Sequence, residues 1–182
     1  TRYISVTGVQ TCALPISAAA LLMSSLHASI HAQVAAKSSL EETVRAINDY
    51  LVENTPANRF VTLFIAELDP ATAEIKFINA GHNPPIVARA GGGIELLDSG
   101  GLPLGLMGFG EYTPGVLTLA PGDTVVVYSD GVSEANNINE DEFGMERLKD
   151  VIRTNIARPA SGIRDKIESA LSDFTEIGRA HV

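Results

Sequence analysis

The sequence predicts an α+β fold, a four-layer α-β-β-α sandwich of antiparallel sheets, because helical and strand patterns fall in separate parts of the chain. The segments 60–68 and 125–128 are apolar at successive positions, so each is expected to be a strand covered on both faces. A single sheet with helices on one face is the simpler alternative. It would leave Val61, Leu63 and Ile65, or the side chains opposite them, in water. Two stacked sheets with helices outside would bury both faces, which favours the sandwich.

The first predicted helix spans residues 18–36, which are rich in Ala and Leu and contain neither Gly nor Pro. Its buried stripe is expected to comprise Met23, Leu26, Ile30 and Val34. His27 and His31 are four residues apart on the same helix, a spacing that can hold a metal ion. No third ligand stands near them in the sequence, so we interpret both as exposed polar residues.

A capping box begins the second predicted helix, with Ser39 as the N-cap and Glu42 reaching back to it. The helix is expected to run to about Asn54 and to end at Thr55-Pro56. Its apolar stripe comprises Leu40, Val44, Ile47 and Leu51. Two further helices are predicted near the C-terminus, over residues 145–156 and 162–174.

In the middle of the chain, Gly and Pro separate short apolar runs, a pattern typical of an antiparallel meander. Strands are expected over residues 60–68, 74–78, 86–89, 94–97, 116–119 and 124–129. Turns are expected at residues 69–72, 91–93 and 120–123, and a stretch punctuated by Gly and Pro covers residues 100–110. Asp123 in the last turn is interpreted as structural, because Asp and Gly set the geometry of tight turns.

Asp130 and Gly131 directly follow the predicted strand over residues 124–129. A carboxylate at the rim of a core costs desolvation free energy unless a cation or a hydrogen-bond donor meets it. The glycine would let the chain turn sharply without a Cβ clash. A plain Asp-Gly turn is the alternative interpretation.

Both ends of the chain resemble translated sequencing adapter. Codons that encode Val6 to Ile16 can spell a common short-read adapter oligonucleotide, residues 1–5 fit its index region, and residues 177–182 fit its reverse complement. We therefore expect residues 17–176 to be the native part. Cys12 and His181 lie in the excluded ends, so the native part has no cysteine and no disulfide or thiolate chemistry.

The composition excludes several classes of function. Of the 182 residues, 13 are Lys or Arg and 22 are Asp or Glu; without Arg2 and Arg179 the formal net charge is −11, which argues against nucleic acid as a partner. No apolar run approaches the roughly 20 residues of a membrane span, so a cytoplasmic domain is expected. Aromatic residues make up 5% and Trp is absent, which disfavours a carbohydrate-binding sandwich.

Five ordered motifs resemble the SpoIIE-like branch of the PPM-type metal-dependent Ser/Thr phosphatases. They lie at residues 60–63, 79–85, 119–123, 128–135 and 143–148. The resemblance implies the four-layer PPM fold and removal of phosphate from phosphoserine or phosphothreonine. The implied substrate is a phosphorylated bacterial regulatory protein of the anti-sigma-factor antagonist type. The resemblance also implies two Mn²⁺ or Mg²⁺ ions, which would activate a water molecule that attacks the phosphorus atom.

The resemblance also implies the site residues. Asp130 is expected to be one of the metal-binding carboxylates, with Gly131 leaving room beside it. His82 and Asn79 lie in the loop at the edge of the metal cleft, where His82 could donate a proton to the leaving group or support a metal ligand. The alternative is that both simply hydrogen-bond the loop backbone. Glu134 could face the cleft, although an exposed Glu at the turn is an equal alternative.

The sequence also departs from the family pattern. The other metal carboxylates of the family come from an early Gly-Asp strand, an Asp-x-Ser-Gly-His-Gly loop and a late Asp-Asp pair, none of which stands in residues 17–176. We therefore expect an incomplete, inactive domain with open sheet edges and an active parent protein. A non-catalytic module that binds its partner through residues 100–110 is the alternative. The oligomeric state stays open, with a homodimer as one option.

Overall fold

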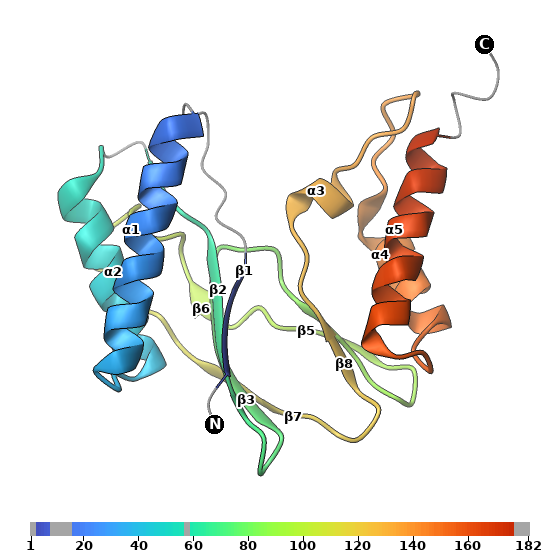
Figure 1. Cartoon of the computed structure of the whole chain (residues 1–182), viewed down its shortest axis with the longest axis horizontal. Coiled ribbons are helices and arrows are strands. Elements are labelled where there is room, and N and C mark those ends of the chain that lie inside the picture. Colours follow the sequence, from blue (N-terminus) through green and yellow to red (C-terminus); the bar gives the residue numbers. More distant parts are fainter. Residues whose placement is uncertain (1–2, 8–15, 57–58, 177–182) are drawn as a thin grey trace. The chain divides into compact units, whose positions relative to one another are not determined.

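The computed structural model describes residues 3–7, 16–56 and 59–176 (Figure 1). The chain divides into two compact units. Unit 1 comprises Thr1–His82 and Asp98–Thr118, and unit 2 comprises Asn83–Leu97 and Leu119–Val182. Within the described ranges, no helix combines the length and the apolar character that crossing a membrane requires.

Unit 1 contains a five-stranded sheet. Its strands are β1 (Tyr3–Thr7), β2 (Leu63–Asp69), β3 (Glu74–Ala80), β6 (Gly100–Gly101) and β7 (Gly115–Thr118). They follow the order β1-β2-β3-β6, and β7 also pairs with β3. The β3–β6 pair is parallel, whereas the other pairs are antiparallel. The β2–β3 hairpin therefore forms the centre of this sheet.

Strand β2 is apolar on both faces, as the sequence predicts for residues 60–68, and β3 adds apolar side chains to each face. Leu63, Ile65 and Ile78 are buried in the core that the sheet shares with two helices. On the opposite face, the rings of Phe64 and Phe77 stack with their centroids 5.8 Å apart. Because successive side chains of a strand point to opposite faces, an uninterrupted apolar run fills both of them.

Helices α1 (Ile16–Ala35) and α2 (Leu40–Asn54) lie side by side in unit 1 (Figure 1). The predicted capping box of α2 is confirmed: Ser39 Oγ accepts from the Glu42 N–H at 3.2 Å, and the Ser39 N–H donates to Glu42 Oε2 at 2.8 Å. The predicted apolar stripe is also confirmed, since its four members are all buried: Leu40, Val44, Ile47 and Leu51.

The buried stripe predicted for α1 is only partly correct. Leu26 and Ile30 are 2% and 4% exposed, whereas Met23 and Val34 are 39% and 41% exposed. Leu22 packs against the core in place of Met23. An α-helix buries only the stripe that its neighbours cover, and here that stripe is the row of residues 22, 26 and 30. Val34 lies in the last turn of the helix.

Unit 2 contains a three-stranded antiparallel sheet in the order β5-β4-β8, formed by β4 (Ile86–Ala88), β5 (Ile94–Leu96) and β8 (Thr124–Val126). Its helices are α3 (Asp130–Ser133), α4 (Gly144–Thr154) and α5 (Ala160–Glu176). The core of unit 2 joins β4 to α4 and α5 and includes Ile86, Ala88, Leu148, Ile152, Ile163 and Phe174.

The strand predicted over residues 124–129 is shorter and less buried than expected. It ends at Val126, and its residues are only half-buried. Of residues 125–128, only Tyr128 is buried, at 8% exposure. In the described part of the chain, β8 pairs with β4 and with no strand on its other edge. The prediction that residues 125–128 are covered on both faces is therefore wrong.

The tight turn at residues 120–123 joins two different sheets. It follows β7 of the five-stranded sheet and precedes β8 of the three-stranded sheet. The Asp123 N–H donates to the Ala120 carbonyl oxygen at 3.0 Å, which closes the turn. The presence of two sheets excludes the single-sheet alternative and confirms the α+β class with antiparallel sheets.

Strand β6 approaches β3 so closely that Gly100 has no room for a side chain. A Cβ placed on Gly100 would overlap the backbone carbonyl of Asn79. We expect Gly100→Ala to push β6 away from β3 and to lower the free energy of unfolding by about 2–3 kcal/mol. Urea unfolding followed by circular dichroism measures this. Gly91→Ala is the matched control, because no heavy atom lies within 4 Å of its Cβ position; equal losses in both variants would contradict the prediction.

Candidate active site

The segment after β3 folds back on itself through the side chain of Asn79. Asn79 Oδ1 accepts from the His82 backbone N–H at 2.7 Å, and Asn79 Nδ2 donates to the His82 carbonyl oxygen at 2.9 Å. The two residues are 4% and 7% exposed. His82 Nδ1 lies 3.5 Å from Thr62 Oγ1. The two predicted catalytic residues thus lie together in unit 1, and Asn79 forms the loop hydrogen bonds of the alternative interpretation.

Gly81 allows this loop to form, and two features require a glycine there. Its φ is +73°, in the left-handed region that side chains disfavour. A Cβ at this position would also lie 2.5 Å from Pro103 Cγ. The backbone at Gly81 therefore fixes where His82 stands relative to Asn79.

Asp130 is the first residue of α3 and lies four residues beyond the end of β8. Its Oδ1 accepts from the Gly131 N–H at 2.7 Å, and its carbonyl oxygen accepts from the Glu134 N–H at 2.7 Å. The residue is half-buried. One helical turn therefore positions the carboxylate, whereas the sequence predicted that a strand end would do so. Asp130 and Gly131 lie together in unit 2.

Gly131 has more space around it than the sequence analysis expected. A Cβ at this position meets Ser129 Oγ at an ordinary 3.6 Å, and the backbone is outside the left-handed region. The expectation that Gly131 relieves a Cβ clash in a sharp turn is therefore wrong, and its place beside a metal-binding carboxylate stays a prediction. Glu134 is exposed at the C-terminal cap of α3.

Asp123 anchors the β7–β8 connection in unit 2. Its carboxylate accepts from the backbone N–H groups of Ala120 and Ala90, both at 2.9 Å, and from Arg89 Nη1 at 2.6 Å. Its side chain is 2% exposed. The hydrogen bonds from Ala120, Ala90 and Arg89 lower the pKa of Asp123 from 3.8 to about 2. The structural role predicted for Asp123 is therefore confirmed.

These hydrogen bonds make stability depend on pH. Because the folded-state pKa of Asp123 is about 2 and the ordinary value is 3.8, its carboxylate stabilises the fold above pH 3.8 and loses this effect as the pH falls toward 2. We expect Asp123→Asn to lower Tm at pH 7 by about 5 °C and to flatten the fall in Tm between about pH 5 and pH 2. Asp150→Asn on the exposed side of α4 is the control. Parallel curves of Tm against pH for the unsubstituted protein and Asp123→Asn would contradict the lowered pKa of Asp123.

The described residues do not fit a complete dinuclear metal centre. In residues 3–7, 16–56 and 59–176, no group of three or more His, Cys, Asp or Glu side chains could hold a metal ion. Mg²⁺ requires near-octahedral oxygen coordination, and a second metal about 4 Å away needs further ligands. Asp130 offers one carboxylate. Its role as a metal ligand stays a prediction.

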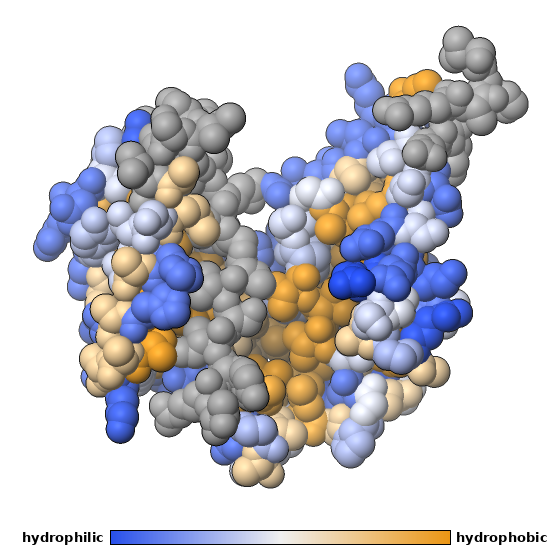
Figure 2. Space-filling model, viewed as in Figure 1, coloured by the Kyte–Doolittle hydropathy of each residue, from blue (hydrophilic) through white to orange (hydrophobic). Residues whose placement is uncertain are grey.

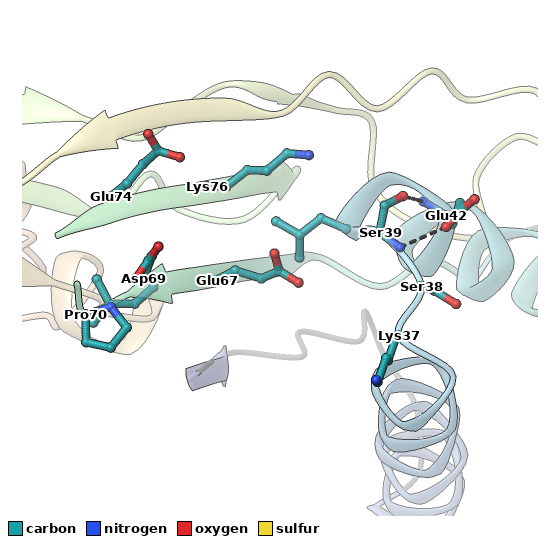
Figure 3. Close-up of a pocket in the computed structure, with 11 residues that line it drawn as sticks. Lys37, Ser38, Ser39, Glu42, Glu67, Asp69, Pro70, Glu74 and Lys76 are labelled. Atoms are coloured by element: carbon teal, nitrogen blue, oxygen red, sulfur yellow. Dashed lines mark hydrogen bonds between the residues drawn. The ribbon is translucent and has the colours of Figure 1, made fainter. Parts of the chain in front are cut away.

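Unit 1 also contains a polar groove that the sequence analysis missed. It lies between the start of α2 and the β2–β3 hairpin and has a volume of about 700 Å³ (Figure 3). Glu67, Glu74 and Lys76 line it from the strands, and Lys37 lines it from the α1–α2 connection. The ion pair from Lys76 Nζ to Glu41 at 2.9 Å lowers the pKa of Glu41. Segments about 30 residues apart in sequence form the groove, so no local motif indicates it.

An apolar groove of about 310 Å³ runs along β8 and α5 in unit 2. Apolar side chains gather along β8 in Figure 2. The residues that line the groove include Val125, Val127, Val132, Ile163, Ile167 and Leu171. The groove lies beside the β8 edge that no described strand covers.

A comparison with protein families gives a match to the model for Stage II sporulation protein E (SpoIIE) over residues 17–181. The chain belongs to the SpoIIE family. This SpoIIE-family chain is 32% identical to Protein IcfG of Synechocystis sp. (strain ATCC 27184 / PCC 6803 / Kazusa) over 115 residues, which cover 63% of the chain and 18% of IcfG. It is 24% identical to the phosphoserine phosphatase RsbP of Bacillus subtilis (strain 168) over 161 residues, which cover 86% of the chain and 38% of RsbP. It therefore spans less than half of either relative.

The crystal structure of the RsbU and RsbW domains of a Mycobacterium tuberculosis protein shows the same fold. It matches the SpoIIE-family chain with a TM-score of 0.80 at 23% identity. The matched region is 95% of this chain and 48% of the Mycobacterium tuberculosis chain. The PP2C phosphatase domain of SpoIIE from Bacillus subtilis has the same fold as well, with a TM-score of 0.71 at 17% identity over 93% of this chain and 52% of that chain.

Proposed function

We propose that this SpoIIE-family chain is part of a PPM-type protein phosphatase domain whose complete form hydrolyses phosphoserine or phosphothreonine with Mn²⁺ or Mg²⁺. The observation that carries the proposal is the family match over residues 17–181, which includes Asp130 where the resemblance expects a metal-binding carboxylate. The name of the relative RsbP, a phosphoserine phosphatase, supports it further.

The proposed roles come from the resemblance to the PPM-type phosphatases. Asp130 would be one metal ligand of the complete domain, with Gly131 next to it. His82 would donate a proton to the leaving serine or threonine oxygen. The hydrogen bonds between Asn79 and the His82 backbone hold this histidine in a fixed loop, and such positioning is what a general acid requires.

The proposed substrate is a phosphorylated regulatory protein of the anti-sigma-factor antagonist type in the bacterial cytoplasm. The Mycobacterium tuberculosis relative carries RsbU and RsbW domains in one chain, which supports a partner of this regulatory class. The formal net charge of −9 favours a protein over a nucleic acid.

We also propose that residues 1–16 and 177–182 are adapter-derived and that residues 17–176 are a partial phosphatase domain. The start of the family match at residue 17 supports the first boundary, whereas the match runs on to residue 181 and does not support the second. Residues 1–2, 8–15 and 177–182, with Cys12 and His181, lie outside the described residues. Tyr3–Thr7 pairs with β2 as β1, and an edge strand offers backbone groups that an extended segment of any sequence can pair with. The parent gene upstream of Ser17 tests this directly: an open reading frame that encodes residues 1–16 would contradict it.

The 182-residue chain itself is expected to be almost inactive. With Mn²⁺ and a phosphoserine peptide, it should release phosphate at less than about a thousandth of the rate of the domain completed from its parent gene, because missing ligands remove several kcal/mol of transition-state stabilisation. Phosphate release measured side by side on both proteins tests this. Comparable Mn²⁺-dependent rates in the two proteins would contradict the prediction that the 182-residue chain is almost inactive. No phosphate release by the completed domain would contradict the phosphatase proposal.

A non-catalytic binding module is the second candidate, and the surface of residues 100–110 favours it. This segment exposes large apolar side chains: Leu102, Leu106, Met107 and Phe109, the last at 84% exposure. Exposed apolar patches are common in protein interfaces. If the completed domain bound its partner but released no phosphate, and Phe109→Ser abolished the binding, this candidate would replace the phosphatase.

A further inference from the structure

Helix α1 places two histidines in direct contact on its outer surface. His27 and His31 are both exposed, and their Nε2 atoms are 3.2 Å apart. The ring centroids are 4.4 Å apart with an interplanar angle of 68°. The neighbouring Ala28 and Ala32 are exposed as well, and their methyl groups leave the two rings accessible.

This Nε2–Nε2 distance suits a hydrogen bond between the two imidazoles, and it is also the distance that two nitrogen ligands of one metal ion have. Zinc–imidazole bonds are about 2.0–2.1 Å long. At coordination angles between square-planar and tetrahedral, two such bonds place their nitrogen atoms about 2.9–3.4 Å apart. The observed 3.2 Å falls inside this range. The helix backbone therefore already brings both donors to chelating distance, and the rings need only turn so that both lone pairs face one ion.

We propose that His27 and His31 form a bidentate surface site for a late first-row divalent ion such as Zn²⁺, Ni²⁺ or Cu²⁺. Imidazole nitrogen suits these ions, whereas Mg²⁺ and Mn²⁺ prefer oxygen ligands. Water completes the coordination shell, because no group of three His, Cys, Asp or Glu side chains forms a metal site in the described part of the chain. Both imidazoles bind in the neutral form, with the remaining proton on Nδ1. This site is independent of the proposed phosphatase function.

The whole chain, purified without a polyhistidine tag, tests the site with Zn²⁺ alone. Binding to the folded state should raise Tm by about 3–5 °C when free Zn²⁺ is about ten times its dissociation constant. Equal Mg²⁺ should leave Tm unchanged. Isothermal titration should give one Zn²⁺ per chain.

The matched control is the double variant His31→Ala/Ala32→His, which keeps all four histidines but breaks the four-residue spacing. It should lose the Zn²⁺-dependent rise in Tm and bind Zn²⁺ at least about tenfold more weakly. His27→Gln should do the same. If the double variant and the unsubstituted chain respond equally to Zn²⁺, the metal binds elsewhere and the proposal is overturned. The absence of any response in the unsubstituted chain would overturn it too.

Discussion

Asp130→Asn in the domain completed from the parent gene is expected to lower kcat/KM for a phosphoserine peptide by about 10³-fold, because loss of a metal-binding carboxylate removes about 4 kcal/mol of transition-state stabilisation. The asparagine keeps an Oδ1 that can accept from the Gly131 N–H, as Asp130 does at 2.7 Å. The start of α3 should therefore stay intact, and the loss should reflect the missing charge. The measurement is the rate of phosphate release across a range of Mn²⁺ concentrations.

Glu134→Gln is the matched control for this substitution, since it removes a carboxylate from the same segment. Glu134 is exposed at the end of α3, so its substitution should change kcat/KM by less than about twofold. Equal losses in both variants would point to a general effect of charge. Unchanged activity and Mn²⁺ dependence in Asp130→Asn would remove Asp130 from the metal site.

Asn48→Ala is expected to cause the largest loss of stability in unit 1, about 3 kcal/mol. Asn48 is 1% exposed, and its side chain hydrogen-bonds three residues of the segment 105–112 to α2. Its Nδ2 donates to the Met107 carbonyl oxygen at 2.9 Å, and its Oδ1 accepts from the Gly105 N–H at 2.9 Å and from the Tyr112 hydroxyl at 3.1 Å. The alanine would leave three polar groups without this partner, and two of these hydrogen bonds are buried.

Asn54→Ala on the same helix is the control for Asn48→Ala. Asn54 is exposed and donates to the Tyr50 carbonyl oxygen, so its loss should cost less than about 0.5 kcal/mol. Tyr112→Phe adds a second test, because it removes the hydroxyl that donates to Asn48 Oδ1; burial and the nearby Asp49 raise the pKa of this hydroxyl to about 12, so it stays a donor at neutral pH. Urea unfolding of Asn48→Ala, Tyr112→Phe and the double variant should give a coupling energy of about 1 kcal/mol. Additive losses would contradict the shared hydrogen bond.

The sequence predicted those parts of the fold that depend on local interactions. Helix α2 begins and ends where the capping box and Thr55 place its ends, since a capping box is formed within four residues. The β2–β3 hairpin is also correct, because its turn and its apolar run are contiguous. Asp123 could be assigned a structural role from its tight turn alone.

The remaining differences come from contacts between distant segments. The burial of residues 125–128 depends on what covers β8, and the chain sequence near β8 does not specify this. The assignment of β7 and β8 to different sheets depends on strand pairing, which adjacent residues do not determine. The sequence placed Asp130 at a strand end, yet it lies in the first turn of α3. Asn79 and His82 were predicted together because the family resemblance places both in one motif, and the hydrogen bonds between them form within four residues.

A crystal structure of the completed domain with Mn²⁺ tests most directly whether Asp130 is a metal ligand in a SpoIIE-family phosphatase domain. We expect a carboxylate oxygen of Asp130 within about 2.0–2.4 Å of a Mn²⁺ ion. A fully loaded Mn²⁺ site from which the Asp130 carboxylate stands apart, in contact only with solvent and the Gly131 N–H, would contradict it.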